Sequence, residues 1–460
     1  MCIIGYNYHT ENIDMSKFFI PRRLVISTII GVLGLGVAHS SVAAVKAVPE
    51  IPMKMSLNAG LRPIWTPPST EVSSNDSDIQ DIVRGALKEQ KPNYPQLPPF
   101  IPDQNYDRTI ELVFAIDTTG SMGGLIEGAK QKVWRIINEV TQRQKASNQK
   151  ILVRVGLVAY RDVGDNYVTR ITPLSSDLDA VYSKLMNFQA EGGGDEPEHV
   201  RLAMSDALNA TGWSARSNQN DAYGSTNGIG RLSQVLFLVG DAPPHDDYKQ
   251  YPSVQKTASE AKDRGVIVNA IQVGNIQSTT PIWREVAHKG GGEYFAIAQN
   301  GGVQTVSTPY DTRLAELGDD MSRRGVYYGS GRDKVVSEVA GYTTSLAAAP
   351  TSARADRAIN KSINIEAAYH SSDLVQAVEN KAIDLNKVKT DELPPEMQKM
   401  TQAERQVYIQ QKIEERAKIR QEITDLSKKR EQYLREQGEK TNKSDAFDSA
   451  VEKALQKQIK

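Results

Sequence analysis

Four short apolar segments set the fold class of this chain. They are rich in Val, Ile and Leu: "TIELVFAI" (109–116), "KILVRVGLVAY" (150–160), "SQVLFLVG" (233–240) and "GVIVNAIQVG" (265–274). Near-continuous apolar runs of this length indicate strands that are buried on both faces. The intervals between them contain segments with helical apolar spacing, such as "LIEGAKQKVWRIINEV" (125–140) and "EHVRLAMSDALNA" (198–210). The alternation predicts an α/β fold, a doubly wound and mostly parallel sheet with helices on both faces.

Other segments define the edges of this sheet. "YVTRITPL" (167–174) alternates in polarity and follows a strand after a short turn, which predicts one antiparallel edge strand. "GGGEYFAIA" (290–298) is expected to be the last strand and "TRLAELGDDMSRR" (312–324) a closing helix. We therefore place this domain at residues 108–330. The polar stretch 214–231 is interpreted as a loop at the opposite rim, where we expect no chemistry.

The N-terminus has the three parts of a secretory signal. Basic residues up to Arg23 precede an apolar run at 24–38 and the small residues Val42–Ala43–Ala44. We interpret residues 1–44 as a signal peptide that starts at Met15, because the preceding segment is polar. The alternative is an uncleaved inner-membrane anchor, although the run is short for a span and contains glycines. The pair Arg22–Arg23 also permits a twin-arginine signal.

These features predict a periplasmic or secreted bacterial protein. The single cysteine, Cys2, lies before Met15. The mature chain would then contain no cysteine and no disulfide framework.

Three further segments flank the domain. Residues 45–107 are rich in proline and predict an extended tether, and residues 331–385 a linker with one short helix at "SDLVQAVENKAI" (372–383). Residues 386–460 predict a charged helical or coiled-coil tail that could self-associate, with a capping box at Thr401 and Glu404. Arg416 and Arg430 interrupt its apolar seam. The mean hydropathy of −0.46 fits a chain with much solvated material.

The overall charge and the motifs exclude several classes of function. The chain has 55 Lys and Arg against 56 Asp and Glu, a net charge of −1, which gives no electrostatic footprint for nucleic acid. Neither a P-loop nor a Gly-x-Ser-x-Gly elbow is present, and no base partner is apparent for Ser121. We therefore expect no enzymatic activity. The alternative is a Mg²⁺-dependent phosphatase-like hydrolase, but Thr119 stands where such enzymes need a second aspartate.

Oxygen-bearing side chains follow two of the predicted strands, and a separate acidic loop offers further carboxylates. Asp117, Thr119 and Ser121 come after the first strand, "GGGDEPEH" (192–199) lies between two helices, and Asp241 directly ends a strand. Positions i, i+2 and i+4 of extended backbone face the same way, so the first three can present oxygens to one point. Carboxylates and hydroxyls suit a hard cation, Mg²⁺ or another such as Mn²⁺ or Ca²⁺. The alternative is a capped helix start.

The motif "DTTGS" followed by an amphipathic helix, a glycine-rich loop and a strand-ending aspartate resembles the von Willebrand factor A domain, over about residues 108–330. The resemblance implies a Rossmann-like fold and a metal-ion-dependent adhesion site in which Asp117, Thr119 and Ser121 form the first motif and Asp241 the third. The family usually has a neutral threonine in the second loop, where this chain offers an acid, for which we expect Asp195. Three carboxylates around a divalent cation leave the site at about −1, which weakens its attraction for an acidic partner.

The resemblance implies a protein-binding or scaffolding role, here for an exported protein with a partner in the cell envelope. The alternative is a structural protein that acts through self-association of its tail, and membrane contact is expected only for an uncleaved signal. Five residues near the metal are expected to form a rim for the partner: Arg161, Asp162, Glu196, Glu198 and His245.

Overall fold

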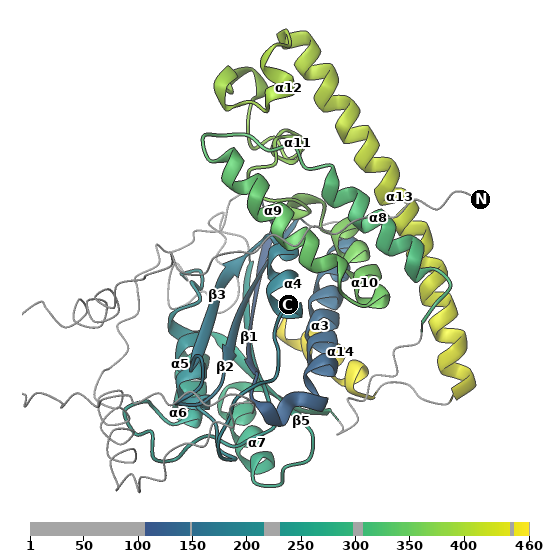
Figure 1. Cartoon of the computed structure of the whole chain (residues 1–460). Helices are drawn as coiled ribbons and strands as arrows, with labels where there is room; N and C mark the ends of the chain where they lie inside the picture. The colour runs from purple at the N-terminus through teal and green to yellow at the C-terminus, as the bar shows by residue number, and fades with distance from the viewer. Residues whose placement is uncertain (1–105, 148–149, 216–230, 298–306, 442–445, 460) are drawn as a thin grey trace, which may run out of the picture. The chain divides into compact units, whose positions relative to one another are not determined.

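The computed structural model describes residues 106–147, 150–215, 231–297, 307–441 and 446–459. These residues contain a six-stranded sheet of order β3-β2-β1-β4-β5-β6 (Figure 1). Its strands are β1 (Arg108–Asp117), β2 (Ile151–Tyr160), β3 (Thr169–Ser175), β4 (Arg231–Gly240), β5 (Val266–Val273) and β6 (Gly291–Ile297). Strand β3 runs antiparallel to β2, and the other pairs are parallel. The predicted doubly wound sheet with one antiparallel edge strand is confirmed.

Strand β1 lies at the centre of the sheet and is buried on both faces. Its side chains alternate, so Leu112 and Phe114 join one apolar core and Val113 and Ala115 the other. Phe114 stacks on Phe237 of the adjacent β4 with ring centroids 4.9 Å apart. Because both faces need cover, the strand reads as a continuous apolar run in the sequence.

Helices cover both cores. One core is closed by α3 (Ile126–Ser147) and α4 (Leu178–Met186), joined by α14 (Ala446–Gln458) near the end of the chain. The other is closed by α5 (Val200–Asn209), α6 (Val254–Asp263) and α7 (Thr279–Lys289). In Figure 1 α3 and α14 lie on one side of the sheet and α5, α6 and α7 on the other. The short 3₁₀ helix η2 (Gly120–Gly124) connects β1 to α3.

The segment predicted as a linker, 331–385, differs from that prediction because most of it is helical. After α8 (Asp311–Arg323) the chain forms α9 (Arg332–Ala347), α10 (Thr351–Ile363) and α11 (Leu374–Glu379), with a 3₁₀ turn η4 (Ile365–Ala367). The alanines that suggested a linker allow close packing instead. A Cβ on Gly318 of α8 would lie 2.7 Å from the Cβ of Ala358 in α10, closer than two such atoms approach. Small residues therefore hold α8 and α10 together.

The C-terminal segment is helical, as predicted. It contains η5 (Leu385–Lys387), η6 (Thr390–Glu392), α12 (Pro395–Gln398) and the 40-residue α13 (Gln402–Thr441). The predicted capping box is present, since Thr401 N–H donates to Glu404 Oε2 over 2.7 Å. Helix α13 packs along α8, α10 and α11 of the same chain.

Arg416 and Arg430 of α13 have a role that the sequence pattern did not indicate. Arg416 is fully buried and forms a bidentate pair with Asp373, at 2.7 and 2.9 Å. Arg430 Nε donates to Asp311 over 2.7 Å. These arginines hold α13 to the other helices rather than interrupting its contact face.

Several predictions fall outside the described residues. These are the signal peptide, almost all of the tether and most of the loop 214–231. Within the part of the chain that is described, no helix combines the length and the apolar character needed to cross a bilayer.

Candidate metal centre at the strand ends

The centre lies where the strand order reverses. From β1 the chain continues to β2 and β3 on one side, and then returns to β4, β5 and β6 on the other. Strands β1 and β4 are parallel neighbours with Ile116 opposite Val239, so Asp117 and Asp241 follow at the same edge. Crevices at such switch points, beyond the carboxyl ends of the strands, are the usual ligand sites of open α/β sheets.

The four residues predicted from the strand ends form one connected group. Asp117 Oδ1 accepts hydrogen bonds from the Thr119 amide at 2.9 Å and the Thr119 hydroxyl at 2.6 Å. The Thr119 hydroxyl lies 3.0 Å from Ser121 Oγ, which donates to Asp241 Oδ1 over 3.1 Å. Thr119 precedes η2 but makes no side-chain cap bond to it. The hydroxyls therefore face the two carboxylates, which argues against a simple helix cap.

The second loop supplies Glu198 to this group. Its backbone is fixed to the β4–α6 loop, because its N–H donates to Pro243 O over 2.9 Å and its carbonyl accepts from His245 N over 3.1 Å. The side chain is buried at 2 % exposure. A Cβ built on Gly193 would lie 3.1 Å from Glu198 Oε1 and 3.3 Å from the Thr119 Cβ, and its φ of +76° favours glycine, which leaves room for these two side chains to lie together.

No ion pair with a described basic residue compensates the buried acids of this group. Burial, reinforced by the charge of Asp241, raises the pKa of Asp117 to about 7. Burial, and then the charges of Asp117 and Asp162, raise the pKa of Glu198 to about 9. Within the described residues, Asp117 Oδ2 and Glu198 Oε2 are buried without a hydrogen-bond partner. Oxygen atoms that are shielded from water and repel one another are suited to a hard divalent cation.

Two close contacts that depend on glycine shape the crevice. The Gly120 N–H donates to Gly192 O over 2.9 Å, which ties the first motif to the glycine-rich loop. Gly192 has a φ of +75°, and a Cβ there would overlap the Asp165 carboxylate. That carboxylate in turn accepts from Gly193 N at 3.0 Å. The loop 192–199 can therefore fold over the strand ends.

Comparison with known proteins identifies the domain that carries this centre. A family model described as von Willebrand factor A domain matches residues 111–309. Residues 111–309 form a von Willebrand factor A domain. The protein named von Willebrand factor A domain-containing protein 7 is 39 % identical over 97 residues in Mus musculus and 40 % identical over 97 residues in Rattus norvegicus. These alignments cover 21 % of this chain and 10 % of each relative, so the chain matches about a tenth of their length.

A solved structure is also similar. The conserved hypothetical protein BatB from Bacteroides thetaiotaomicron aligns with 15 % identity and a TM-score of 0.29, over 42 % of this chain and 90 % of that one.

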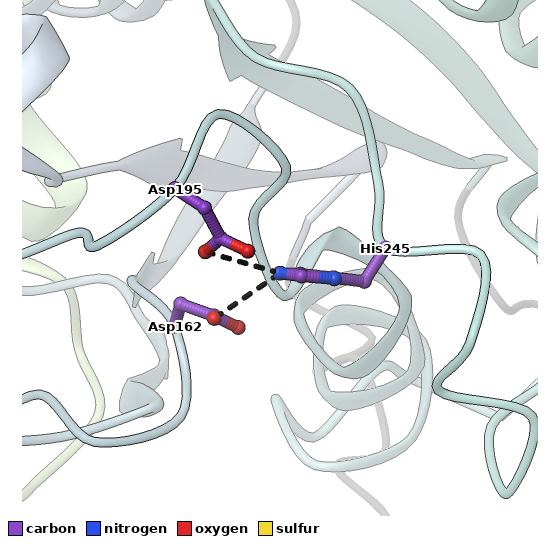
Figure 2. A group of neighbouring side chains, drawn as sticks. All are labelled: Asp162, Asp195 and His245. Carbon is purple, nitrogen blue, oxygen red and sulfur yellow. Dashed lines mark ion pairs between the residues drawn. The ribbon is translucent and has the colours of Figure 1, made fainter.

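Asp195 is not the buried acid that the glycine-rich loop supplies to the strand-end centre, although we expected it to have that position. Its side chain is 55 % exposed, and its Oδ1 lies 3.6 Å from His245 Nε2 (Figure 2). Glu198, which we placed on the rim, has the buried position beside Thr119 instead. The reason is the backbone pairing of Glu198 with Pro244, which turns this residue inward while Asp195 stays in the glycine-rich bend.

The predicted partner rim is also mostly buried. Arg161 is 3 % exposed, donates to Gln189 O over 3.0 Å and lies over the Tyr167 ring. Asp162 and His245 are buried as well, at 3 % and 8 % exposure. Glu196 is exposed and accepts from Ser278 Oγ over 3.0 Å, so it remains the one predicted rim residue at the described surface.

Proposed function

We propose that the A domain binds a protein partner at the strand-end crevice through a divalent cation, with Mg²⁺ as the expected ion. Asp117, Thr119, Ser121, Asp241 and Glu198 would hold it, directly or through water. The observation that carries this proposal is the pair of buried, unpartnered carboxylate oxygens beside two hydroxyls. A bound ion supplies the positive charge that these oxygens lack and an open coordination position for a partner. A domains typically serve as protein-interaction modules.

The charge of the centre bears on the kind of partner. Three ionised carboxylates, from Asp117, Asp241 and Glu198, around a doubly charged ion leave a net charge of about −1. Such a centre attracts an acidic side chain less than a neutral centre would. We therefore propose that the partner approaches through a neutral oxygen or a metal-bound water, rather than through its own carboxylate.

We also propose that the protein is exported to the bacterial cell envelope, in the periplasm or beyond. The support is the basic segment, apolar run and small-residue site in residues 1–44. Fractionation of cells that express the full-length chain, with sequencing of the mature N-terminus, tests this. Cleavage after residue 44 is expected, and a cytoplasmic chain with an intact N-terminus would overturn the proposal.

The contacts of α13 argue against the tail as the main binding element. Ile409, Ile419 and Ile423 are buried against other helices of the same chain. The apolar face that a coiled-coil partner would need is thus covered.

We also propose no enzymatic role. Ser121 contacts Thr119 and Asp241 rather than a histidine base in the described structure. A phosphatase screen of the purified protein, with Asp241→Asn as its control, tests that.

Recovery of partners from an envelope extract tests the binding proposal. The wild-type chain is immobilised with Mg²⁺ or with a chelator, beside Asp117→Ala and the matched control Asp263→Ala, which removes an exposed carboxylate of α6. We expect a partner that is retained by wild type and Asp263→Ala with Mg²⁺, and lost with chelator or in Asp117→Ala. Equal recovery under all conditions would mean that another surface, such as the helical tail, binds the partner.

A further inference from the structure

We propose that Asp162, Asp195 and His245 bind a second cation, of the borderline class typified by Zn²⁺. The three residues come from separate segments: Asp162 follows β2, Asp195 lies in the glycine-rich loop and His245 lies between β4 and α6. One ligand atom from each lies within 4.8 Å of the other two. Figure 2 shows both carboxylates directed at the same ring nitrogen. This site is separate from the strand-end centre, because it uses nitrogen and a different set of carboxylates.

The spacing of the ligand atoms fits an ion between them. His245 Nε2 lies 3.2 Å from Asp162 Oδ2 and 3.6 Å from Asp195 Oδ1. A charge-assisted hydrogen bond between such groups is about 2.7–2.9 Å long. Tetrahedral coordination with bonds of roughly 2.0–2.1 Å instead places ligand atoms about 3.3–3.4 Å apart. The two observed distances lie on either side of that value.

The imidazole is held with its free nitrogen toward the two acids. His245 Nδ1 lies 3.1 Å from Asp247 Oδ1, and a carboxylate can only accept, so Nδ1 carries the proton. The ring also stacks on Tyr248, with centroids 4.3 Å apart. His245 is more than nine-tenths buried, and its Nε2 makes no hydrogen bond within the described residues. A lone pair aimed at two carboxylates is unfavourable unless a cation lies between them.

The surrounding groups resemble the outer shell of zinc sites. Metal-bound histidines commonly donate their other ring N–H to a carboxylate, which fixes the tautomer, and Asp247 does this for His245. The Tyr248 hydroxyl donates to Asp162 at 3.0 Å and so orients that ligand. One imidazole and two carboxylates leave a fourth position. Asp195 is the exposed ligand, so that position faces the surface.

Zinc titration of the purified full-length chain tests this site. The protein is first stripped with a chelator, and Zn²⁺ affinity is then measured by competition with a chromophoric chelator. We expect one equivalent in wild type and an affinity at least about tenfold lower in His245→Gln and Asp195→Asn. Asp247→Asn should weaken binding about 10- to 100-fold, because it removes an outer-shell partner. His288→Gln, which removes an exposed histidine of α7, should bind like wild type.

The same titration separates this site from the strand-end centre. Asp117→Ala should lose the Mg²⁺ effect and keep its zinc, so failure of one proposal leaves the other intact. Asp195 is exposed, so Asp195→Asn should fold normally, and circular dichroism checks each variant. A wild type that binds no zinc would overturn the inference. So would zinc that His245→Gln still holds, or zinc that disappears in Asp117→Ala.

Discussion

Two regions of this chain bury carboxylates, but only one of them pairs these carboxylates with basic side chains. Among the helices, Asp373 is paired with Arg416, and both side chains are fully buried. At the strand ends, Asp117 and Glu198 are also buried, but their neighbours are hydroxyl and amide groups, and the two carboxylates repel each other when both are charged. Because isolated buried charge is costly, the first region supplies its cations from arginine and the second requires protons or an external ion.

The pKa shifts follow the same division. Burial alone would raise the pKa of Asp179, which lies where α4 contacts the helical region, but Arg357 and Lys361 of α10 outweigh it and hold that pKa well below its ordinary range. The pKa values of Asp117 and Glu198 move the other way, to about 7 and about 9. A buried carboxylate paired within the chain therefore indicates structure, and one without such a pair indicates a place for a ligand.

The largest expected effect comes from breaking a buried pair. Arg416→Leu would leave Asp373 charged and unpaired among the helices, and should lower the free energy of unfolding by about 3–5 kcal/mol. Chemical denaturation measures it. Arg313→Leu is the matched control, since its pair with Glu422 is exposed and should contribute less than about 1 kcal/mol. Similar losses in both variants would contradict the distinction between buried and exposed pairs.

The pH dependence of stability should have opposite signs in the two regions. In chelator, Asp117 and Glu198 favour their protonated forms in the fold, so stability should fall as the pH rises from about 5 to 9. Each unit of pKa difference corresponds to about 1.4 kcal/mol, so Asp117 alone, with a pKa of about 7, gives a fall of about 3 kcal/mol between pH 5 and 7. The depressed pKa of Asp179 acts at the other end, and its contribution is lost as the pH falls below about 4.

Denaturation at several pH values checks this prediction. Asp117→Asn should reduce the fall between about pH 5 and 7, leave the part at higher pH that Glu198 causes, and leave the acid limb unchanged. A wild type whose stability in chelator does not change between pH 5 and 9 would show that the strand-end acids are already compensated.

Mg²⁺ should stabilise one region only. At a free concentration of 100 times its Kd, a ligand that binds only the folded state adds about 2.7 kcal/mol. We expect a rise in Tm with Mg²⁺ in wild type and in Arg313→Leu, and no rise in Asp241→Asn. An equal rise in Asp241→Asn would place the ion elsewhere.

The smallest effect concerns the start of α13. Thr401→Ala removes the hydroxyl of the capping box and should cost about 1 kcal/mol. Thr344→Ala, a hydroxyl in the middle of α9 that donates to Ala340 O, is the control and should change stability little. Thermal melting compares the two variants. Equal losses of stability would show that the capping box does not stabilise the start of α13.

Much of the A domain could be predicted because its signals are local. The near-continuous apolar runs predicted a mostly parallel sheet. The alternation of Asp117, Thr119 and Ser121 after β1 was enough to group these three residues. The inward acid of the glycine-rich loop could not be chosen from the sequence. Asp195, Glu196 and Glu198 are adjacent in irregular backbone, and their directions depend on pairing with residues near Pro244.

The helical region was harder to predict for a similar reason. Its acids and arginines are distant in sequence, as with Asp373 and Arg416, 43 residues apart. A pattern read along α13 alone shows an arginine that interrupts an apolar face. Only the packing of α13 on other helices shows that the arginine belongs to that face.

A crystal structure of the protein soaked with Mn²⁺, analysed by anomalous scattering, tests the central claim most directly. We predict a peak at the ends of β1 and β4, with oxygens of Asp117, Ser121, Asp241 and Glu198 around it. A crystal with Mn²⁺ bound elsewhere and none in this crevice would contradict the account.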